Sequence, residues 1–146
     1  MGNTLRKKKV IIMRLTWYEN NKFVSDRLLT NDAYKAIVRV LSGQETVTKW
    51  YIAVGADPAV EDIYDTTLYD EMVRKEATIT LEETDEFSRI RFDATIDTTD
   101  VTEAIGELGL LLETNNATYL VDRTSYGPQE LTESKTFTAI LEFHRR

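Results

Sequence analysis

The sequence predicts a mainly β protein: an antiparallel β-sandwich of about eight short strands with one amphipathic helix packed on it. Apolar and polar residues alternate over several segments of strand length, which is typical of strands with one buried face. Turn residues separate these segments at short intervals, as in folds built from hairpins. One segment, from Asn31 to Ser42, has instead the apolar spacing of a helix.

The length of 146 residues fits one domain that can bury a core without disulfides or a metal. We expect a basic N-terminal arm over residues 1–9 and a single sandwich domain over residues 10–146. The chain contains no cysteine, which excludes thiol catalysis, thiolate metal sites and disulfides. No apolar run approaches the roughly 20 residues of a membrane span, so we expect no membrane partner.

The net charge of −7 is unevenly distributed along the chain. The first 24 residues hold six basic residues against Glu19 alone, which leaves +5 there and −12 on the remainder. An acidic body repels phosphate, so nucleic acid is not an expected partner. Four successive basic residues then form either a docking arm for an acidic protein surface or a solvated tail: Arg6, Lys7, Lys8 and Lys9.

The first strand is predicted from Val10 to Tyr18, and residues 19–21 form a turn before a short partner strand over residues 22–24. The helix follows, with Thr30 or Asn31 as its N-cap and Gly43 at its end. Its apolar face is predicted to contain Ala33, Ala36, Ile37, Val40 and Leu41.

The next strand, residues 50–54, ends at Gly55, where a residue without Cβ can take a left-handed or crowded backbone. Asp57 and Pro58 begin a loop or the first turn of a helix, because proline has a preset φ. We expect Thr66 to cap a short helical segment before the chain becomes extended at Val73. The inward face of that segment would be Leu68, Met72 and Tyr69.

The second half of the chain is predicted to be all β. Alternation over residues 76–81 and 89–96 indicates a hairpin with an acidic connector at residues 82–86. Residues 108–112 and 118–121 indicate another hairpin around Asn115 and Asn116. Residues 126–128 are predicted to be a loop ahead of the last strand. The inward residues of that strand are Phe137, Ala139, Leu141 and Phe143.

The middle of the chain resembles a known family through one ordered set of residues: Ala53-Val54-Gly55, Pro58, Asp65-Thr66-Thr67-Leu68, Glu71, Arg74 and Lys75. This set is similar to the pattern A-V-G…P…D-T-x-L-x-x-E-x-x-R-K of small structural proteins encoded among the virion genes of tailed bacteriophages, often labelled tail-fibre-related. Residues 25–31 and 107–110 extend the resemblance over most of the chain. The glycine- and threonine-rich part of the family pattern is replaced here by Gly55-Ala56-Asp57, which is shorter and acidic.

The resemblance implies a non-enzymatic structural protein of a tailed phage particle, made in the host cytoplasm and located in the virion. Such a protein docks on the capsid as a decoration or stabilising protein, or on the tail or collar as a fibre adaptor. Its partners would be other virion proteins, in a homo-oligomer or symmetric array. The sequence does not choose between capsid and tail.

Residues with catalytic chemistry are few. His144, the only histidine, lies near the C-terminus, and no serine occupies a nucleophile-elbow motif. Three aspartates near one strand end form either a calcium loop with oxygen ligands or a solvated loop with capping carboxylates: Asp93, Asp97 and Asp100. We therefore predict no catalytic residue, no cofactor and no metal ligand.

Exposed aromatic residues give the remaining candidate surface. Tyr64 and Tyr69, together with the basic arm, are the predicted partner interface, while Gly55 and Pro58 are predicted to be structural turn residues.

Two other functions stay open. Outward-facing aromatics are also compatible with a carbohydrate-binding module, and a carboxylate pair that meets only in three dimensions would give a small hydrolase.

Overall fold

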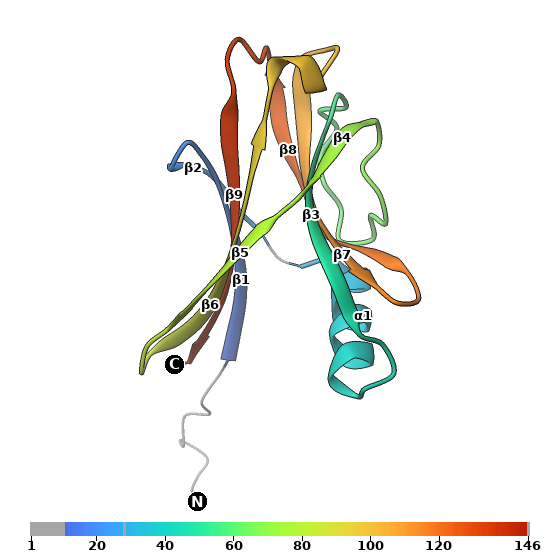
Figure 1. The fold of residues 1–146 in the computed structure, drawn as a ribbon, viewed down its shortest axis with the longest axis vertical. Helices are drawn as coiled ribbons and strands as arrows, with labels where there is room; N and C mark the ends of the chain where they lie inside the picture. The colour runs from blue at the N-terminus through green and yellow to red at the C-terminus, as the bar shows by residue number, and fades with distance from the viewer. Residues whose placement is uncertain (1–10, 28, 146) are drawn as a thin grey trace, which may run out of the picture.

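The computed structural model describes residues 11–27 and 29–145, and it confirms the predicted fold class: two antiparallel sheets and, within the described residues, a single α-helix. The sheets face one another as two layers (Figure 1). Nine strands are present there, one more than predicted: β1 (Ile11–Glu19), β2 (Lys22–Arg27), β3 (Val47–Gly55), β4 (Glu71–Glu76), β5 (Thr78–Glu83), β6 (Phe87–Ile96), β7 (Ile105–Thr114), β8 (Thr118–Gln129) and β9 (Lys135–Arg145).

The five-stranded sheet has the order β2-β1-β9-β6-β5. Its first hairpin turns at Asn20 and Asn21, whose φ angles of 47° and 68° are the left-handed values that a two-residue hairpin turn requires. The predicted turn is thus confirmed. The prediction that the partner strand stops at Val24 is wrong, because β2 continues to Arg27 and pairs there with Leu15.

The four-stranded sheet has the order β4-β3-β7-β8. The β7–β8 hairpin turns at Asn115 and Asn116 as predicted, but β8 continues to Gln129 and pairs there with Ile105. The prediction of a loop at residues 126–128 is therefore wrong. Gly127 has a φ of 67°, and Pro128 is tolerated because β8 is an edge strand.

No helix follows Thr66, so that prediction is also wrong. Residues from Glu71 onward instead pair with β3, since the backbone groups of this segment complete the edge of the four-stranded sheet. The chain then passes from β4 directly into β5 and so crosses from one sheet to the other (Figure 1). The Ala77 amide marks the crossing with a 2.8 Å hydrogen bond to the carbonyl of Trp50.

One apolar cluster fills the space between the sheets. Phe137, Ala139 and Leu141 of the last strand point into it as predicted. Trp17 is completely buried, and Trp50 of one sheet stacks at 4.4 Å on Phe92 of the other. The ring-on-ring contact joins the two layers near the middle of the sandwich.

Helix α1 (Asn31–Leu41) has Thr30 as its N-cap, because the Thr30 hydroxyl accepts a hydrogen bond from the amide of Ala33. Ser42 is the C-cap, so the helix ends one residue before the predicted boundary. Ala33 and Ala36 pack into the core. Leu41, which was predicted on that apolar face, is 82% exposed, because the last turn extends beyond the edge of the sandwich.

Candidate functional site

A long loop, residues 56–70, connects β3 to β4 at the side of the four-stranded sheet (Figure 1). Leu68 of this loop is buried in a small apolar cluster separate from the main core. Its partners there are Ala53, Leu111 and Leu120. Each of them lies between two residues of the main core along its strand, so its side chain points to the opposite, outer face of the sheet. The loop therefore covers the outer face of that sheet, and we call residues 56–70 the clamped loop for the contacts described next.

Glu107 on β7 lies completely buried beneath the clamped loop. Its Oε2 accepts hydrogen bonds from the amides of Asp57 at 3.2 Å and Asp70 at 2.8 Å. Its Oε1 accepts one from the amide of Tyr69 at 2.9 Å. A single carboxylate thus binds the backbone at both ends of the loop.

Arg123 on β8 is the second half of the clamp. Its Nε donates a 2.7 Å hydrogen bond to Oε1 of Glu107, and its two terminal nitrogens donate to the carbonyls of Asp57 at 3.0 Å and Ala59 at 2.9 Å. The guanidinium also lies 3.7 Å from the centre of the Tyr69 ring. The charge of each partner is compensated within the buried pair, whereas either member alone would be a costly buried charge.

Three glycines allow the loop to lie this close to the sheet. A Cβ on Gly55 would meet the Glu107 carboxylate and lie 2.5 Å from the carbonyl oxygen of Asp70. A Cβ on Gly106 would lie 2.6 Å from the carbonyl oxygen of Ala56, and one on Gly109 would collide with Leu68. For Gly55 the sequence predicts either a left-handed or a crowded backbone. The structure shows the crowded one, and the φ of Gly55 lies outside the left-handed region.

The predicted turn residue Pro58 lies within the clamped loop, directly above the sheet. Its carbonyl accepts a 2.9 Å hydrogen bond from the hydroxyl of Ser125, and Asp57 beside it accepts one from the amide of Ala59. Asp57 and Pro58 therefore form a local turn rather than the start of a helix.

The second half of the loop is held by Asp65. Its Oδ2 accepts a hydrogen bond from the amide of Asp62, and its Oδ1 accepts one from the Tyr69 hydroxyl at 2.5 Å. This hydrogen bond to Asp65, followed by burial, raises the pKa of Tyr69. Of the two tyrosines predicted as an interface, Tyr69 thus has its hydroxyl bound within the loop, while 46% of its surface is exposed to solvent.

The outer side of the clamped loop carries exposed apolar side chains. Val60 is 80% exposed and Tyr64 is 72% exposed, and Ile63 lies between them with nearly half its surface in solvent. These residues follow one another closely in the middle of the loop, between the parts that Glu107 and Arg123 bind, and the amide of Asn31 donates a 2.9 Å hydrogen bond to the carbonyl of Ile63 there. The predicted interface residue Tyr64 is therefore displayed to solvent, while the basic arm, Arg6, Lys7, Lys8 and Lys9, lies outside the described residues.

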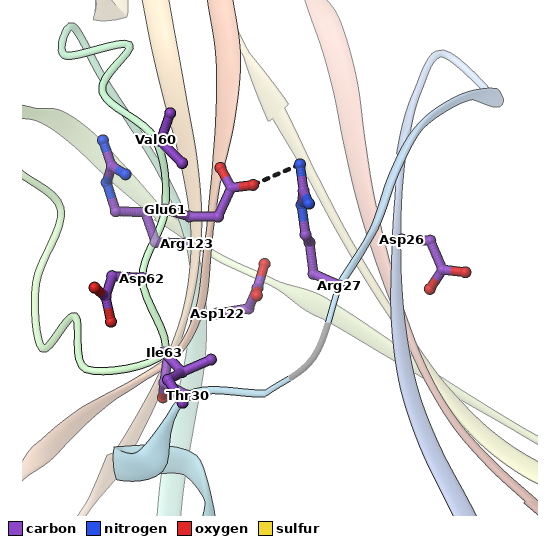
Figure 2. Close-up of a pocket in the computed structure, with 9 residues that line it drawn as sticks. All are labelled: Asp26, Arg27, Thr30, Val60, Glu61, Asp62, Ile63, Asp122 and Arg123. Atoms are coloured by element: carbon purple, nitrogen blue, oxygen red, sulfur yellow. Dashed lines mark ion pairs between the residues drawn. The ribbon is translucent and has the colours of Figure 1, made fainter.

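The same loop forms one wall of a cavity of about 360 Å³. Figure 2 shows the cavity between the loop, the end of β2 and strand β8. An ion pair of 2.5 Å between Arg27 on β2 and Glu61 on the loop spans it. The lining residues are Asp26, Arg27, Thr30, Val60, Glu61, Asp62, Ile63, Asp122 and Arg123.

Asp122 is the buried acid of this cavity, with only 2% of its surface exposed. Its Oδ2 accepts a 2.8 Å hydrogen bond from the indole nitrogen of Trp17. Burial raises the pKa of Asp122 to about 7, and the Trp17 hydrogen bond opposes this shift only in part. A carboxyl that titrates near neutral pH next to a cavity is a candidate functional group.

The three aspartates considered as calcium ligands are not brought together as a cluster. Asp93 pairs with Arg91, Asp97 accepts a hydrogen bond from Ser134, and Asp100 pairs with Lys75. Within residues 11–27 and 29–145 no group of three or more histidine, cysteine, aspartate or glutamate side chains is arranged to hold a metal ion. The structure places His144 in β9, where its backbone pairs with Ile12 and Phe87.

The clamp residues Glu107 and Arg123, and the acid Asp122, were not predicted as functional. Glu107 belongs to the residues that carry the resemblance, at the start of the segment 107–110. The available signal was the presence of charged residues inside otherwise apolar strands, in Ile105–Thr114 and in the Asp122-Arg123 pair of β8. Such charges are rarely buried without a partner.

Comparison with protein-family models, with curated proteins and with solved structures finds no match to this chain. In the part of the chain that the structure describes, no helix is both long and apolar enough to cross a membrane.

Proposed function

We propose that this chain is a non-enzymatic structural protein of a tailed bacteriophage particle and that the clamped loop is its docking surface for another virion protein. The particle assignment is supported by the residue pattern from Ala53 to Lys75. The docking assignment is supported by one observation: exposed apolar side chains on a loop that a buried ion pair binds at both ends.

Rigidity is what makes this loop a good binding surface. A flexible loop loses conformational entropy when it binds, whereas the clamped loop is already held at Asp57, Tyr69 and Asp70 by Glu107. Tyrosine is enriched among residues that contribute most to protein interfaces, and Tyr64 is exposed with apolar neighbours. Repetition of one such contact in a symmetric array gives firm attachment from individually weak contacts.

The test compares two matched double variants for binding to phage particles that lack this protein. Val60→Ser with Tyr64→Ser removes the two most exposed apolar groups of the loop. Val38→Ser with Tyr34→Ser removes the same two residue types from the helix, where they are 65% and 45% exposed. We expect the loop variant to lose at least tenfold in affinity, about 1.4 kcal/mol, and the helix variant to bind as the unchanged protein does. Equal binding by both would contradict the proposal.

The number of copies per particle distinguishes the two positions within the virion. Decoration of the shell requires hundreds of copies, whereas a tail or collar position requires about a dozen or fewer, because the symmetry of each site sets the count. Quantitative mass spectrometry of purified particles measures this number directly.

A further inference from the structure

The cavity beside the clamped loop has more acid than base among its own residues. Four acidic residues are among its lining, Asp26, Glu61, Asp62 and Asp122, against the two arginines Arg27 and Arg123. The Asp26 carboxylate, however, points away from the cavity (Figure 2) and pairs with Arg14, so three carboxylates remain. These three carboxylates come from two elements that are far apart in sequence, the loop and β8. Both arginines already have other partners. Arg27 pairs with Glu61, and Arg123 donates to Glu107.

Asp122 forms no ion pair with either arginine in the described part of the chain. One of its oxygens, Oδ2, is bound by the Trp17 indole, while Oδ1 accepts no hydrogen bond from the side chains or backbone of the described residues. Figure 2 shows the Asp122 carboxyl directed into the space between Glu61 and Arg27. A buried carboxylate with one unused oxygen favours a cationic hydrogen-bond donor in the adjacent space.

The rim of the cavity indicates what kind of cation fits. Val60 and Ile63 line the cavity and are also exposed at the surface of the clamped loop, next to Tyr64. An apolar rim over an acidic base matches a lysine or arginine side chain, whose alkyl stem packs against apolar groups while its head carries the charge. The volume is at the low end of the roughly 300–1,000 Å³ typical of ligand pockets, so one side chain fits.

We propose that this cavity receives a lysine or arginine side chain of the partner protein, with the Asp122 carboxylate as its ionic partner. The proposal rests on the proposed function, because the docking loop supplies the rim and brings the partner to the cavity. The acidic body of this protein, which carries −12 outside the first 24 residues, favours a basic partner surface.

The pH dependence of binding follows from the groups that face Asp122. The charged groups nearest to it in the cavity lining are Glu61 and Asp62 on the loop and Arg27 on β2. Arg123 acts on it through its charge from the other side of the sheet, while the Asp26 carboxylate points away from the cavity (Figure 2) and pairs with Arg14. Burial raises the pKa of Asp122 to about 7, so the carboxyl is mostly neutral at pH 5.5 and mostly ionised at pH 8. A cation binds the ionised form, so binding is expected to strengthen as the pH rises through 7 and to lower the apparent pKa of Asp122.

The experiment uses the purified full chain, labelled with ¹⁵N, and follows the indole N–H signal of Trp17, which is bonded directly to Asp122. The probe is n-butylguanidinium, an analogue of the arginine side chain, and n-butylurea is its uncharged isostere. Trp50 is the only other tryptophan and lies outside the cavity lining, so it is the internal reference. The Trp50→Phe variant assigns the two signals.

At pH 8 we expect a saturable shift of the Trp17 signal with n-butylguanidinium in the millimolar range, about 1–20 mM, since a lone side chain lacks the rest of the interface. We expect no comparable shift with n-butylurea, at least tenfold weaker binding at pH 5.5, and no shift in Asp122→Asn. The pH comparison uses the unchanged protein, so it holds even where Asp122→Asn does not fold.

Three results would overturn the proposal: no response of Trp17 to n-butylguanidinium, an equal response to n-butylurea, or an equal response at both pH values. Binding of the free probe at micromolar concentration would overturn the assignment to a partner side chain and favour a free small cation. The assay needs no particles. If the probe does not bind but the Val60→Ser, Tyr64→Ser variant loses particle binding, the cavity proposal fails and the docking loop stands. If the probe binds but that variant attaches to particles as the unchanged protein does, the docking loop fails.

Discussion

The Arg123 guanidinium donates a 2.7 Å hydrogen bond from Nε to Oε1 of Glu107, and neither side chain is exposed to solvent. The two residues lie on neighbouring strands, β7 and β8, on the face that the clamped loop covers. Removing one of them leaves the other as a buried charge, and several backbone groups of the loop lose their partner at the same time. The pair therefore connects the stability of the sheet to the shape of the docking surface.

Glu107→Gln is expected to reduce the free energy of unfolding by about 3–5 kcal/mol, because the buried Arg123 then loses its close carboxylate partner and keeps only that of Asp65, at 3.9 Å. Urea denaturation measures this loss. Glu76→Gln breaks the exposed ion pair with Lys49 and should cost no more than about 1 kcal/mol, so it is the control for loss of charge alone.

A double-mutant cycle gives the outcome that would contradict the clamp. Glu107→Leu combined with Arg123→Met should cost clearly less than the sum of the two single changes, since no charge remains buried without a partner. Additive losses would mean that the two side chains stabilise the fold independently.

Gly55→Val is expected to destabilise the protein by about 1–3 kcal/mol, because its side chain occupies the space of the Glu107 carboxylate and of the Asp70 carbonyl. The loop ends at Asp57 and Asp70 would then move away from the sheet, and proteolysis within residues 56–70 should become faster. Thermal unfolding of the variant checks the stability effect. An unchanged melting temperature would show that the crowding at Gly55 is relieved without cost.

Asp122 gives a pH dependence whose sign is set by its raised pKa of about 7. The unfolded carboxyl ionises near pH 4, whereas the folded one keeps its proton up to about pH 7. The stability contributed by this proton is complete below about pH 4 and is lost as the pH rises towards 7, with a slope of up to about 1.4 kcal/mol per pH unit. Above that range the contribution is constant.

Asp122→Asn isolates this effect, since asparagine can still accept the indole hydrogen bond of Trp17 but does not titrate. As the pH rises from 4 to 7, the unfolding free energy of the unchanged protein should fall relative to that of Asp122→Asn. A difference that is independent of pH would mean that the folded carboxyl ionises with an ordinary pKa.

The local hairpins were predictable from the sequence because their signals are local. Asn20-Asn21 and Asn115-Asn116 identify two turns, and alternation identifies β6 and β9. The errors lie where distant pairing overrides local preference. Gly127 and Pro128 suggest a loop, yet they form a bulge within β8, whose pairing with β7 resumes at Gln129 opposite Ile105.

The candidate site was less predictable than the fold for the same reason. Glu107 and Arg123 meet only through the register of β7 and β8, and the groups that they bind come from a loop about fifty residues earlier in the chain. Asp122 lies next to Arg123 in sequence but on the opposite side of the sheet, where it binds Trp17 of the other layer. No local pattern contains that arrangement. A charged residue within an apolar strand was the only indication.

The basic arm, Arg6 to Lys9, remains a prediction about residues outside the described part of the chain. It contains almost no apolar residue apart from Leu5, so removing residues 1–9 should change the melting temperature by only a few degrees. We expect the variant that starts at Val10 to occupy particles poorly, because an arm repeated around a symmetric particle multiplies contacts of about 0.2–1 kcal/mol each.

Salt provides the control for this last effect. Raising the salt concentration from about 0.1 M to 1 M shortens the Debye length from about 10 Å to 3 Å and should weaken particle binding by the full chain to the level of the truncated one. The truncated protein should respond much less, since the screened charges are already absent. If truncation unfolds the protein, the arm is a structural element instead. Equal particle occupancy by both proteins at about 0.1 M salt would show that the arm is a solvated tail and that attachment depends on the clamped loop alone.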